Sequence, residues 1–185
     1  IIFGDIVNHR KEWYKNDMAY TTFENLAEIR KLHEGKKIVF CSGCFDLTHA
    51  GHVLFFEDCK AQGDILVVMV GADAVIQRDK GPERPILNEH LRMKLIDSLK
   101  PVDYVFTDRI ISADAPPLLF IDWVFNALRP DVYVVNGDGF NMPYREEVSK
   151  KYNVDLRVLD RTCPPEFEKI STSGIIKKIR GEKNS

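Results

Sequence analysis

The stretch KIVFCSGCFDLTHAGH, residues 37–52, decides how this sequence is expected to fold. Its first six residues form a short apolar run with β-branched side chains, which is typical of a strand buried on both faces. Residues 50–62 then show helical spacing, so this strand is followed closely by a helix. A strand that leads into a helix is the repeating unit of an α/β sheet.

The same alternation continues through the rest of the chain. Three more apolar runs resemble the first one, at residues 64–71, 131–136 and 154–159. Segments with helical spacing lie between or beside them, at 88–100, 116–128 and 143–152. Asn88 is a suitable N-cap, and the densest loop signals are KGPERP (80–85) and CPP (163–165). We therefore predict an α/β fold, with a parallel sheet and helices on both faces, in one domain over residues 36–185.

Residues 1–35 show a different pattern and are predicted to form a helical extension docked on that domain. Thr21 and Glu24 have the spacing of a capping box. Apolar side chains then line one side of a helix, at Phe23, Leu26, Ile29 and Leu32. Gly35 can end this helix.

The composition is that of an ordinary globular protein. With 185 residues, 44% of them hydrophobic and 29% charged, the chain can bury one core. A formal net charge of −2 leaves no surplus of positive charge for a nucleic-acid partner. No apolar run approaches the roughly 20 residues that span a bilayer, and residues 1–10 are too short and polar for a signal-peptide core. Four irregularly spaced cysteines suggest reduced thiols, so we expect a cytoplasmic protein that binds neither nucleic acid nor membrane.

Two cysteines and two histidines within residues 41–52 raise the question of a metal or redox site. Zinc sites of the Cys2His2 kind usually separate their ligand pairs by about a dozen residues, whereas four residues separate Cys44 from His49. A redox dithiol needs its C-x-x-C at the start of a helix, and the helix here is expected near Ala50. We therefore favour packing at the end of the strand as the role of Cys41 and Cys44.

The histidines point to another chemistry. His49 and His52 lie where the first strand leads into a helix, and open parallel sheets bind ligands at the carboxyl ends of their strands. Three residues apart in a first helical turn, they can project from one side beside unpaired backbone N–H groups. A triphosphate would meet both donors and the positive end of the helix dipole. Gly51 between them would let a ligand approach the backbone closely, whereas a capping histidine and a core histidine are the plainer alternative.

Two motifs carry a resemblance to a known family. GCFDLTHAGH, at 43–52, resembles the signature of the nucleotidyltransferase superfamily that contains cytidylyltransferases and sugar-phosphate adenylyltransferases, with HxGH at its centre. ISTSGIIKKI, at 170–179, resembles the carboxyl-terminal motif of the same family. Two motifs in this order are more specific than either alone. The resemblance covers roughly residues 36–180 and implies a Rossmann-like sheet.

The resemblance also implies a reaction. A phosphorylated small-molecule acceptor would attack the α-phosphorus of a nucleoside triphosphate, and pyrophosphate would leave with the assistance of Mg²⁺. The phosphates would hold most of the Mg²⁺ coordination, and no protein ligand to the metal is predicted. The protein would position the reactants and stabilise charge, without a covalent intermediate. Many members of the family are dimers, so the resemblance also suggests a homodimer.

The resemblance assigns roles to individual residues. His49 and His52 would donate to triphosphate oxygens as charge builds on the α-phosphorus. Lys80 matches the family's lysine after the second strand and would neutralise phosphate charge, although a solvated loop lysine would occupy the same position. These three are the predicted catalytic residues. The positions predicted to contact the nucleotide are Gly43, Cys44, Phe45, Asp46, Gly51, Arg92, Asp138, Ser171, Thr172 and Ser173.

Three of these positions have a more specific expectation. Asp46 is expected to orient its loop by accepting backbone N–H bonds, with direct metal contact as the lesser option. Arg92 matches an arginine that opens the helix after the Lys80 loop and could reach a phosphate, or could lie on the helix surface. In NGDG, at 136–139, Asp138 would lie near the base and ribose, but Asn136 departs from the lysine often found there.

The second motif is expected at the start of the last helix. The hydroxyl and N–H groups of Ser171, Thr172 and Ser173 suit the β- and γ-phosphates, and an ordinary N-cap would also explain them. Arg161 stands where some cytidylyltransferases have an arginine before this motif, but here CPPEFEK, at 163–169, intervenes.

The substrates are less sharply defined than the reaction. KGPERPI (80–86) with LRMKLIDSLKPVDYV (91–105) looks most like heptose 1-phosphate adenylyltransferases and somewhat like archaeal FAD synthetases, both of which use ATP. ISTS preceded by Arg161 is closer to glycerol-3-phosphate and phosphocholine cytidylyltransferases. The longer stretch favours ATP and a sugar phosphate over CTP or FMN. A nucleotide-binding module without catalysis is the alternative from another class, and the combined HxGH, Lys80 and STS set argues against it.

Overall fold

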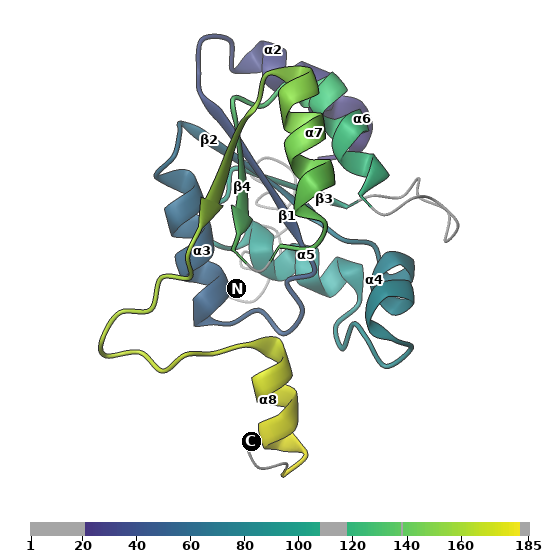
Figure 1. The fold of residues 1–185 in the computed structure, drawn as a ribbon, viewed down its shortest axis with the longest axis vertical. Coiled ribbons are helices and arrows are strands. Elements are labelled where there is room, and N and C mark those ends of the chain that lie inside the picture. Colours follow the sequence, from purple (N-terminus) through teal and green to yellow (C-terminus); the bar gives the residue numbers. More distant parts are fainter. Residues whose placement is uncertain (1–20, 108–117, 138, 182–185) are drawn as a thin grey trace, which may run out of the picture.

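A five-stranded sheet forms the centre of the molecule in a computed structural model that describes residues 21–107, 118–137 and 139–181 (Figure 1). The strands are β1 (Ile38–Gly43), β2 (Ile65–Val70), β3 (Tyr104–Thr107), β4 (Val132–Asn136) and β5 (Asp155–Leu159). They lie in the order β3-β2-β1-β4-β5, and all neighbouring pairs are parallel. Parallel pairing requires a crossover connection, and helices supply it.

Helices cover both faces of this sheet. On one face lie α3 (Ala50–Lys60) and α5 (Glu89–Asp97); on the other lie α2 (Leu26–Leu32), α6 (Leu119–Leu128) and α7 (Met142–Tyr152). A short 3₁₀ turn, η1 (Phe23–Asn25), precedes α2, and α4 (Asp73–Lys80) follows β2. The last helix, α8 (Thr172–Ile179), is reached through a long loop from β5 and lies apart from the layers, below the sheet in Figure 1.

The central strands are apolar throughout because both of their faces are buried. Successive side chains of a strand point to opposite faces, so Val39 and Cys41 enter the core beneath α3 and α5. Ile38 and Phe40 enter the other core, which also contains Leu26 and Ile29 from α2. The sequence pattern of the strand at 37–42 is therefore explained by two cores that share one sheet.

The strand order reverses between β1 and β4. From β1 the chain moves outward to β2 and β3, and then returns to the other side of β1 to form β4 and β5. The carboxyl ends of β1 and β4 therefore open into loops that diverge from each other. Ligands of open α/β sheets bind at this kind of topological switch point.

The predicted fold class is confirmed: the sheet is parallel and has helices on both faces. Asn88 caps α5, since its side chain accepts the N–H of Leu91 at 3.0 Å. Two elements were not predicted. The strand β3 has only four residues, and α4 buries only Ile76, so neither has a strong apolar pattern. Consequently Lys80 ends a helix, and the predicted loop at 80–85 begins at Gly81.

Two local predictions are corrected. The strand at 154–159 was expected to be buried on both faces, but β5 is an edge strand, and Val158 is 52% exposed there. The N-cap of the first described turn is Thr22, not Thr21, whose N–H instead pairs with the carbonyl of Val105 at 2.9 Å. This bond ties the entry of the lead-in segment to the adjacent edge strand β3.

The described part of the lead-in segment contributes to the core. Leu26 and Ile29 of α2 are buried in the core that lies against α6, and His33 contacts the Tyr104 hydroxyl at 2.9 Å. The domain boundary at residue 35 remains a prediction. Within residues 21–107, 118–137 and 139–181, no helix has the length and apolar character needed to cross a membrane.

Candidate active site

The loop after β1 has a constrained backbone. Phe45 and Leu47 both have positive φ angles, of 48° and 47°, a region that bulky side chains rarely adopt. Between them lies Asp46, which is 1% exposed. A conformation of this kind persists only where its surroundings stabilise it, and such strain is often found at functional sites.

Asp46 supplies that stabilisation. Its carboxylate accepts the N–H of Leu87 at 3.0 Å, the N–H of Ile86 at 2.9 Å and Nε of Arg84 at 2.9 Å. Burial raises the pKa of Asp46, but these hydrogen bonds and the Arg84 charge outweigh burial and lower its pKa below the usual value. Asp46 therefore joins the loop after β1 to the loop after α4, as expected of a loop-orienting aspartate, and has little capacity left for a metal.

The two histidines of HxGH form a stacked pair at the start of α3. Their ring centroids are 3.9 Å apart and their planes differ by 19°. His49 is the N-cap residue, and its backbone N–H donates to Nδ1 of His52 at 3.3 Å. Because this nitrogen accepts a hydrogen bond, the neutral ring of His52 carries its proton on Nε2.

The surroundings of both histidines favour the neutral form. Burial, then the neighbouring His49 and Arg161, lower the pKa of His52 to about 3. Burial and the charge of Arg161 also lower the pKa of His49. Both ring nitrogens of His49 are buried, and neither has a hydrogen-bond partner among the described residues. Buried polar groups without partners are costly, so these nitrogens are well suited to meet polar atoms of a ligand.

The tautomer of His52 gives a direct prediction. We expect nitrogen NMR of the imidazole rings to show His52 neutral, with the proton on Nε2, between about pH 5 and pH 8. The reason is that burial and nearby positive charge place its pKa at about 3. A titration midpoint near the usual value of 6.5, or a proton on Nδ1, would contradict this arrangement of the site.

Gly51 makes room for the histidine ring. A Cβ atom at this position would lie 3.1 Å from Cε1 of His49 and 3.4 Å from Cγ2 of Ile170. The glycine therefore lets His49 fold back over the helix and lets the segment before the second motif approach it. The sequence suggested a close approach of the ligand to Gly51, and the structure shows a close approach of protein atoms.

The second motif docks directly on the first. Thr172 donates its hydroxyl to the carbonyl of Asp46 at 2.8 Å, and Ser171 caps α8 by accepting the N–H of Gly174 at 3.1 Å. A further ion pair joins Arg180, after α8, to Glu83 in the loop after α4 (2.7 Å). The N-terminus of α8 is therefore fixed beside the HxGH loop, although the two motifs are 126 residues apart at this contact.

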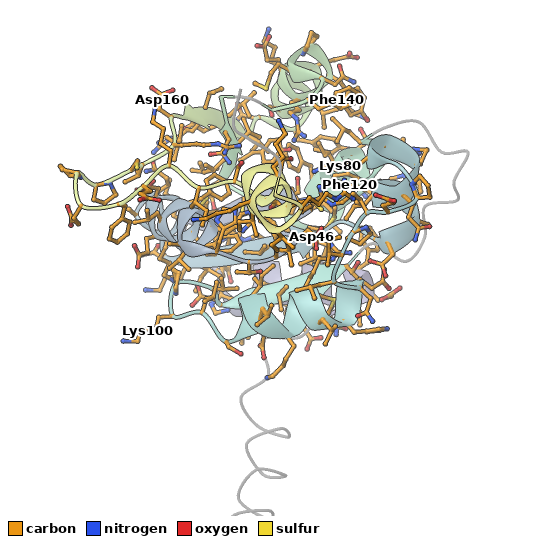
Figure 2. The ribbon with its side chains drawn as sticks, turned by 90° about the horizontal axis from the view of Figure 1, so that it is seen from below. Asp46, Lys80, Lys100, Phe120, Phe140 and Asp160 are labelled. Atoms are coloured by element: carbon orange, nitrogen blue, oxygen red, sulfur yellow. The ribbon has the colours of Figure 1, made fainter. Side chains whose placement is uncertain are left out.

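Two basic side chains act on the histidine pair. Lys80, at the end of α4, is exposed, and its positive charge contributes to lowering the pKa of His52. Arg161, in the loop before α8, lowers the pKa of both histidines. Figure 2 looks at this end of the molecule, with α8 near the centre of the view; Lys80 and Asp46 are labelled beside α8, while Lys100 lies at the lower left edge. The structure thus brings together most of the predicted phosphate-binding positions.

Two predicted nucleotide contacts, Arg92 and Phe45, have other surroundings. Arg92 is fully buried, and its guanidinium donates to the carbonyls of Leu87 (2.8 Å) and Cys44 (2.7 Å) and to Asp73 (2.5 Å). It therefore braces the loops instead of presenting a free donor to solvent. Phe45 is also buried, with its ring at 5.6 Å from the ring of His52.

Gly43 and Cys44 contact the same two buried side chains, Phe45 and Arg92. A Cβ atom on Gly43 would lie 2.8 Å from Cζ of Phe45, so only glycine leaves room for the ring that supports His52. Cys44 is half-buried and offers its carbonyl to Arg92. Arg84, which holds Asp46, was not singled out from the sequence. The sequence indicates only that Arg84 lies in a loop with two prolines. No sequence pattern predicts that Arg84 contacts Asp46.

The loop after β4 is described in part. Asn136 ends β4 and Gly139 donates to its carbonyl at 2.9 Å, whereas Asp138 lies outside the described residues. Ser173 lies in the first turn of α8 and is exposed.

The cysteines belong to the core. Cys41 is fully buried in the cluster under α3, and burial together with Cys59 raises its pKa well above the usual value. The neighbour of Cys41 is therefore Cys59 of α3, instead of the Cys44 of the C-x-x-C pattern. Among the described residues there is no group of three or more His, Cys, Asp and Glu side chains placed to hold a metal ion.

The sequence of this chain is similar to those of known proteins. The sequence model of the cytidylyltransferase-like family matches residues 40–178. The bifunctional protein HldE of Azotobacter vinelandii is 40% identical over 157 residues, which are 84% of this chain and 30% of that protein. HldE of Helicobacter pylori is 39% identical over 149 residues, which are 80% of this chain and 28% of that protein. The chain therefore spans under a third of the length of these curated relatives.

Solved structures share the fold. A lipopolysaccharide core biosynthesis protein from Thermoplasma volcanium superposes with a TM-score of 0.55 at 25% identity, over 69% of this chain and 98% of that one. Pantoate-beta-alanine ligase from Francisella tularensis superposes with a TM-score of 0.58 over 88% of this chain and 77% of that one. At 14% identity the second match shows the fold alone. The family model covers the first motif and all but the last residue of the second, and it confirms the predicted family: the chain belongs to the cytidylyltransferase-like family of nucleotidyltransferases.

Proposed function

We propose that this domain transfers a nucleoside monophosphate from a nucleoside triphosphate to a small phosphorylated acceptor. The observation that carries the proposal is the stacked, neutral His49–His52 pair at the start of α3, with the N-terminus of α8 fixed beside it by the Thr172–Asp46 bond. Two helix N-termini and two imidazole rings at the carboxyl edge of a parallel sheet suit a polyphosphate.

The chemistry is an in-line displacement. A phosphate oxygen of the acceptor forms a new P–O bond to the α-phosphorus, and the bond from that phosphorus to the bridging oxygen breaks. The electron pair of the broken bond leaves with pyrophosphate, so no covalent enzyme intermediate is required. The protein then has to align the two substrates and stabilise the negative charge that builds on the phosphoryl oxygens.

The histidines would act as neutral donors in this step. Nε2–H of His52 is available because Nδ1 is occupied by the N–H of His49. A neutral donor can hydrogen-bond the oxygens around the α-phosphorus without the loss of a proton, and its fixed ring requires little reorganisation. The stacking of the two rings, supported by Phe45 beneath His52, keeps this orientation.

Lys80 and Arg161 would supply the positive charge. The phosphates of the triphosphate would hold most of the Mg²⁺ coordination. Mg²⁺ supplies charge neutralisation on the phosphates when it is bound. We infer that Arg92 and Asp46 contribute by shaping the loops and not by contacting phosphate.

A test of the role of Lys80 follows from its exposure. We expect Lys80→Ala to lower kcat/KM by about 10-fold or more, because a positive charge beside the phosphates is removed. Lys100→Ala is the matched control, since Lys100 lies at the lower left edge of the view in Figure 2, away from Lys80. Equal effects of the two substitutions on kcat/KM would show that Lys80 has no specific role in the site.

ATP and a sugar phosphate are the substrates that we favour. The HldE relatives, at about 40% identity, and the resemblance of residues 80–105 to heptose 1-phosphate adenylyltransferases support this choice. CTP is the second candidate, because Arg161 before the ISTS segment belongs to a pattern seen in cytidylyltransferases. A homodimer and a cytoplasmic location remain predictions.

The decisive assay is the release of pyrophosphate. Each of ATP, CTP, GTP and UTP is combined with Mg²⁺ and a panel of sugar phosphates, polyol phosphates, choline phosphate and FMN. We expect release with ATP and a sugar phosphate only when both substrates are present. Release of pyrophosphate with CTP and glycerol phosphate or choline phosphate would support the second candidate. If no pair of substrates releases pyrophosphate, the proposed nucleotidyltransferase activity is refuted.

A further inference from the structure

The outer side of α5 carries apolar side chains that are exposed. Leu91 is 52% exposed and Leu95 is 44% exposed, and Ile86, just before the N-cap of the helix, is 49% exposed. The inner side of the same helix is buried in the core through Met93 and Ile96. A surface helix normally has one apolar stripe, which faces the core. A second apolar strip on α5 therefore favours a second packing partner.

The spacing of this second strip is that of a helix-pairing seam. Intervals of three, four and three residues separate its members, Asn88, Leu91, Leu95 and Ser98, which we call the α5 strip. Alternating intervals of three and four place side chains on one narrow line along a helix, and this is the line that meets the partner helix in coiled coils. The strip carries no charge, although 29% of the residues of the chain are charged. Two such strips can therefore meet without repulsion between like charges.

The α5 strip is symmetric about its middle. When a two-fold axis sets two α5 helices antiparallel, Leu91 of each copy faces Leu95 of the other. At the two ends, Asn88 faces Ser98. This polar pair is complementary, because the side-chain oxygen of Asn88 accepts the N–H of Leu91 at 3.0 Å and its NH2 group remains as a donor. The Ser98 hydroxyl donates to the carbonyl of Lys94 at 2.8 Å, so its oxygen can accept.

The helix that carries the strip also braces the candidate active site. On its buried side, Arg92 donates to the carbonyl of Cys44 at 2.7 Å, and Glu89 accepts the N–H of Asp73 at 3.0 Å. Figure 2 shows α5 at the lower edge of the ribbon, near the labelled Lys100, while α8 lies near the centre of the view. A partner packed on the α5 strip would therefore stabilise, from its exposed side, the helix that holds Arg92.

We propose that the α5 strip is the surface through which two copies of this chain form a symmetric dimer, with their α5 helices antiparallel. The resemblance suggests a homodimer but names no surface. A second copy is the occupant because the strip is complementary to itself in shape, in charge and in its polar ends. The proposal does not depend on the proposed transferase activity, since association is measured without substrates.

The contact should be weak. Three half-exposed apolar side chains form only the centre of an interface, and polar side chains around them would form its rim. We therefore expect a dissociation constant of about 1–100 µM, which sedimentation equilibrium of the wild-type protein measures.

Two substitutions from leucine to glutamate test the surface. Leu95→Glu places a charge against an apolar side chain of the second copy, so we expect the dissociation constant to rise by at least about 30-fold. Leu32→Glu is the matched control, because Leu32 is 70% exposed on α2, which lies on the other face of the sheet. We expect it to change the constant by less than about 2-fold. Circular dichroism shows whether both variants stay folded.

A mixture of two variants tests the antiparallel arrangement. In Leu91→Lys or Leu95→Glu by itself, each new charge would face a leucine, so both variants should be monomers at a concentration where the wild type is a dimer. In the mixture, the lysine of one copy faces the glutamate of the other, and the two remaining leucines meet, so a mixed dimer should form. Native mass spectrometry distinguishes the mixed dimer from the two monomers.

The outcomes decide the proposal. A wild-type protein that is a monomer up to about 500 µM would overturn it. A dimer that Leu95→Glu leaves intact, or an equal effect of Leu32→Glu, would overturn the assignment to the α5 strip. The absence of a mixed dimer would overturn the antiparallel pairing of the two helices.

Discussion

Replacement of His52 by alanine is expected to lower kcat by at least about 100-fold while the protein stays folded. The substitution removes the Nε2–H donor and also the acceptor for the N–H of His49, so the paired ring loses its orientation. The cost in stability should be small, roughly 1 kcal/mol, because one hydrogen bond and part of a half-buried ring are lost. Steady-state kinetics and thermal unfolding of the same preparation measure the two effects.

An exposed histidine provides the control for this substitution. His90 is exposed on α5, so His90→Ala should leave kcat within about 2-fold of the wild type. His49→Ala should resemble His52→Ala, because the two rings form one unit. Activity of His52→Ala close to that of the wild type would remove the histidine pair from the mechanism.

Replacement of Asp46 by alanine should be the most destabilising change in the site. It leaves the N–H groups of Ile86 and Leu87 and the Arg84 guanidinium without their acceptor, next to a backbone with two positive φ angles. We expect a loss of about 3 kcal/mol in the free energy of unfolding. For a domain of this size the melting temperature should fall by roughly 6–12 °C. Asp79→Ala, which removes an exposed ion pair, should change the free energy by less than about 0.5 kcal/mol.

The contribution of Asp46 should also depend on pH. Its pKa in the folded protein lies below the value of 3.8 expected for the unfolded chain. The carboxylate therefore contributes stability that is fully present above that value and is lost as the pH falls through the folded pKa. Urea unfolding should show a large difference between wild type and Asp46→Ala at neutral pH and a smaller one near about pH 3. A difference independent of pH would contradict the role of the ionised carboxylate.

The sheet and its principal helices could be predicted because their signals are local. The apolar runs at 37–42, 64–71 and 131–136 mark strands buried on both faces, and Asn88 marks the start of α5 through a cap that needs only three residues. The strand β3 and the helix α4 were missed because four residues, or one buried side chain, give no clear period.

The site could be predicted as a set of residues but not as a set of roles. The sequence predicts HxGH and STS as the phosphate side, and the structure brings these two motifs together through the bond between Thr172 and Asp46. Whether an arginine faces solvent or the interior depends on contacts between distant segments. Arg92 was predicted to reach a phosphate, yet Cys44, 48 residues away, accepts its hydrogen bond.

The C-x-x-C pattern suggests a pairing of side chains that the fold does not form. C-x-x-C suggests that Cys41 and Cys44 act together, but neighbouring strand residues point to opposite faces and the chain turns sharply after Gly43. Cys41 therefore meets Cys59 of α3 inside the core, whereas Cys44 stays in the loop. The spacing of the histidines was the more informative signal, because both belong to one helical turn whose geometry is fixed.

The fate of the α-phosphate distinguishes nucleotidyl transfer from phosphoryl transfer and from hydrolysis of ATP. The wild-type protein is incubated with Mg²⁺, a sugar phosphate and ATP that is radiolabelled either at the α-phosphate or at the γ-phosphate, and the products are separated. We expect the α-label in a nucleotide sugar and the γ-label in pyrophosphate, and we expect His52→Ala to form neither product. Transfer of the γ-label to the acceptor, or release of the γ-label as free phosphate, would contradict nucleotidyl transfer.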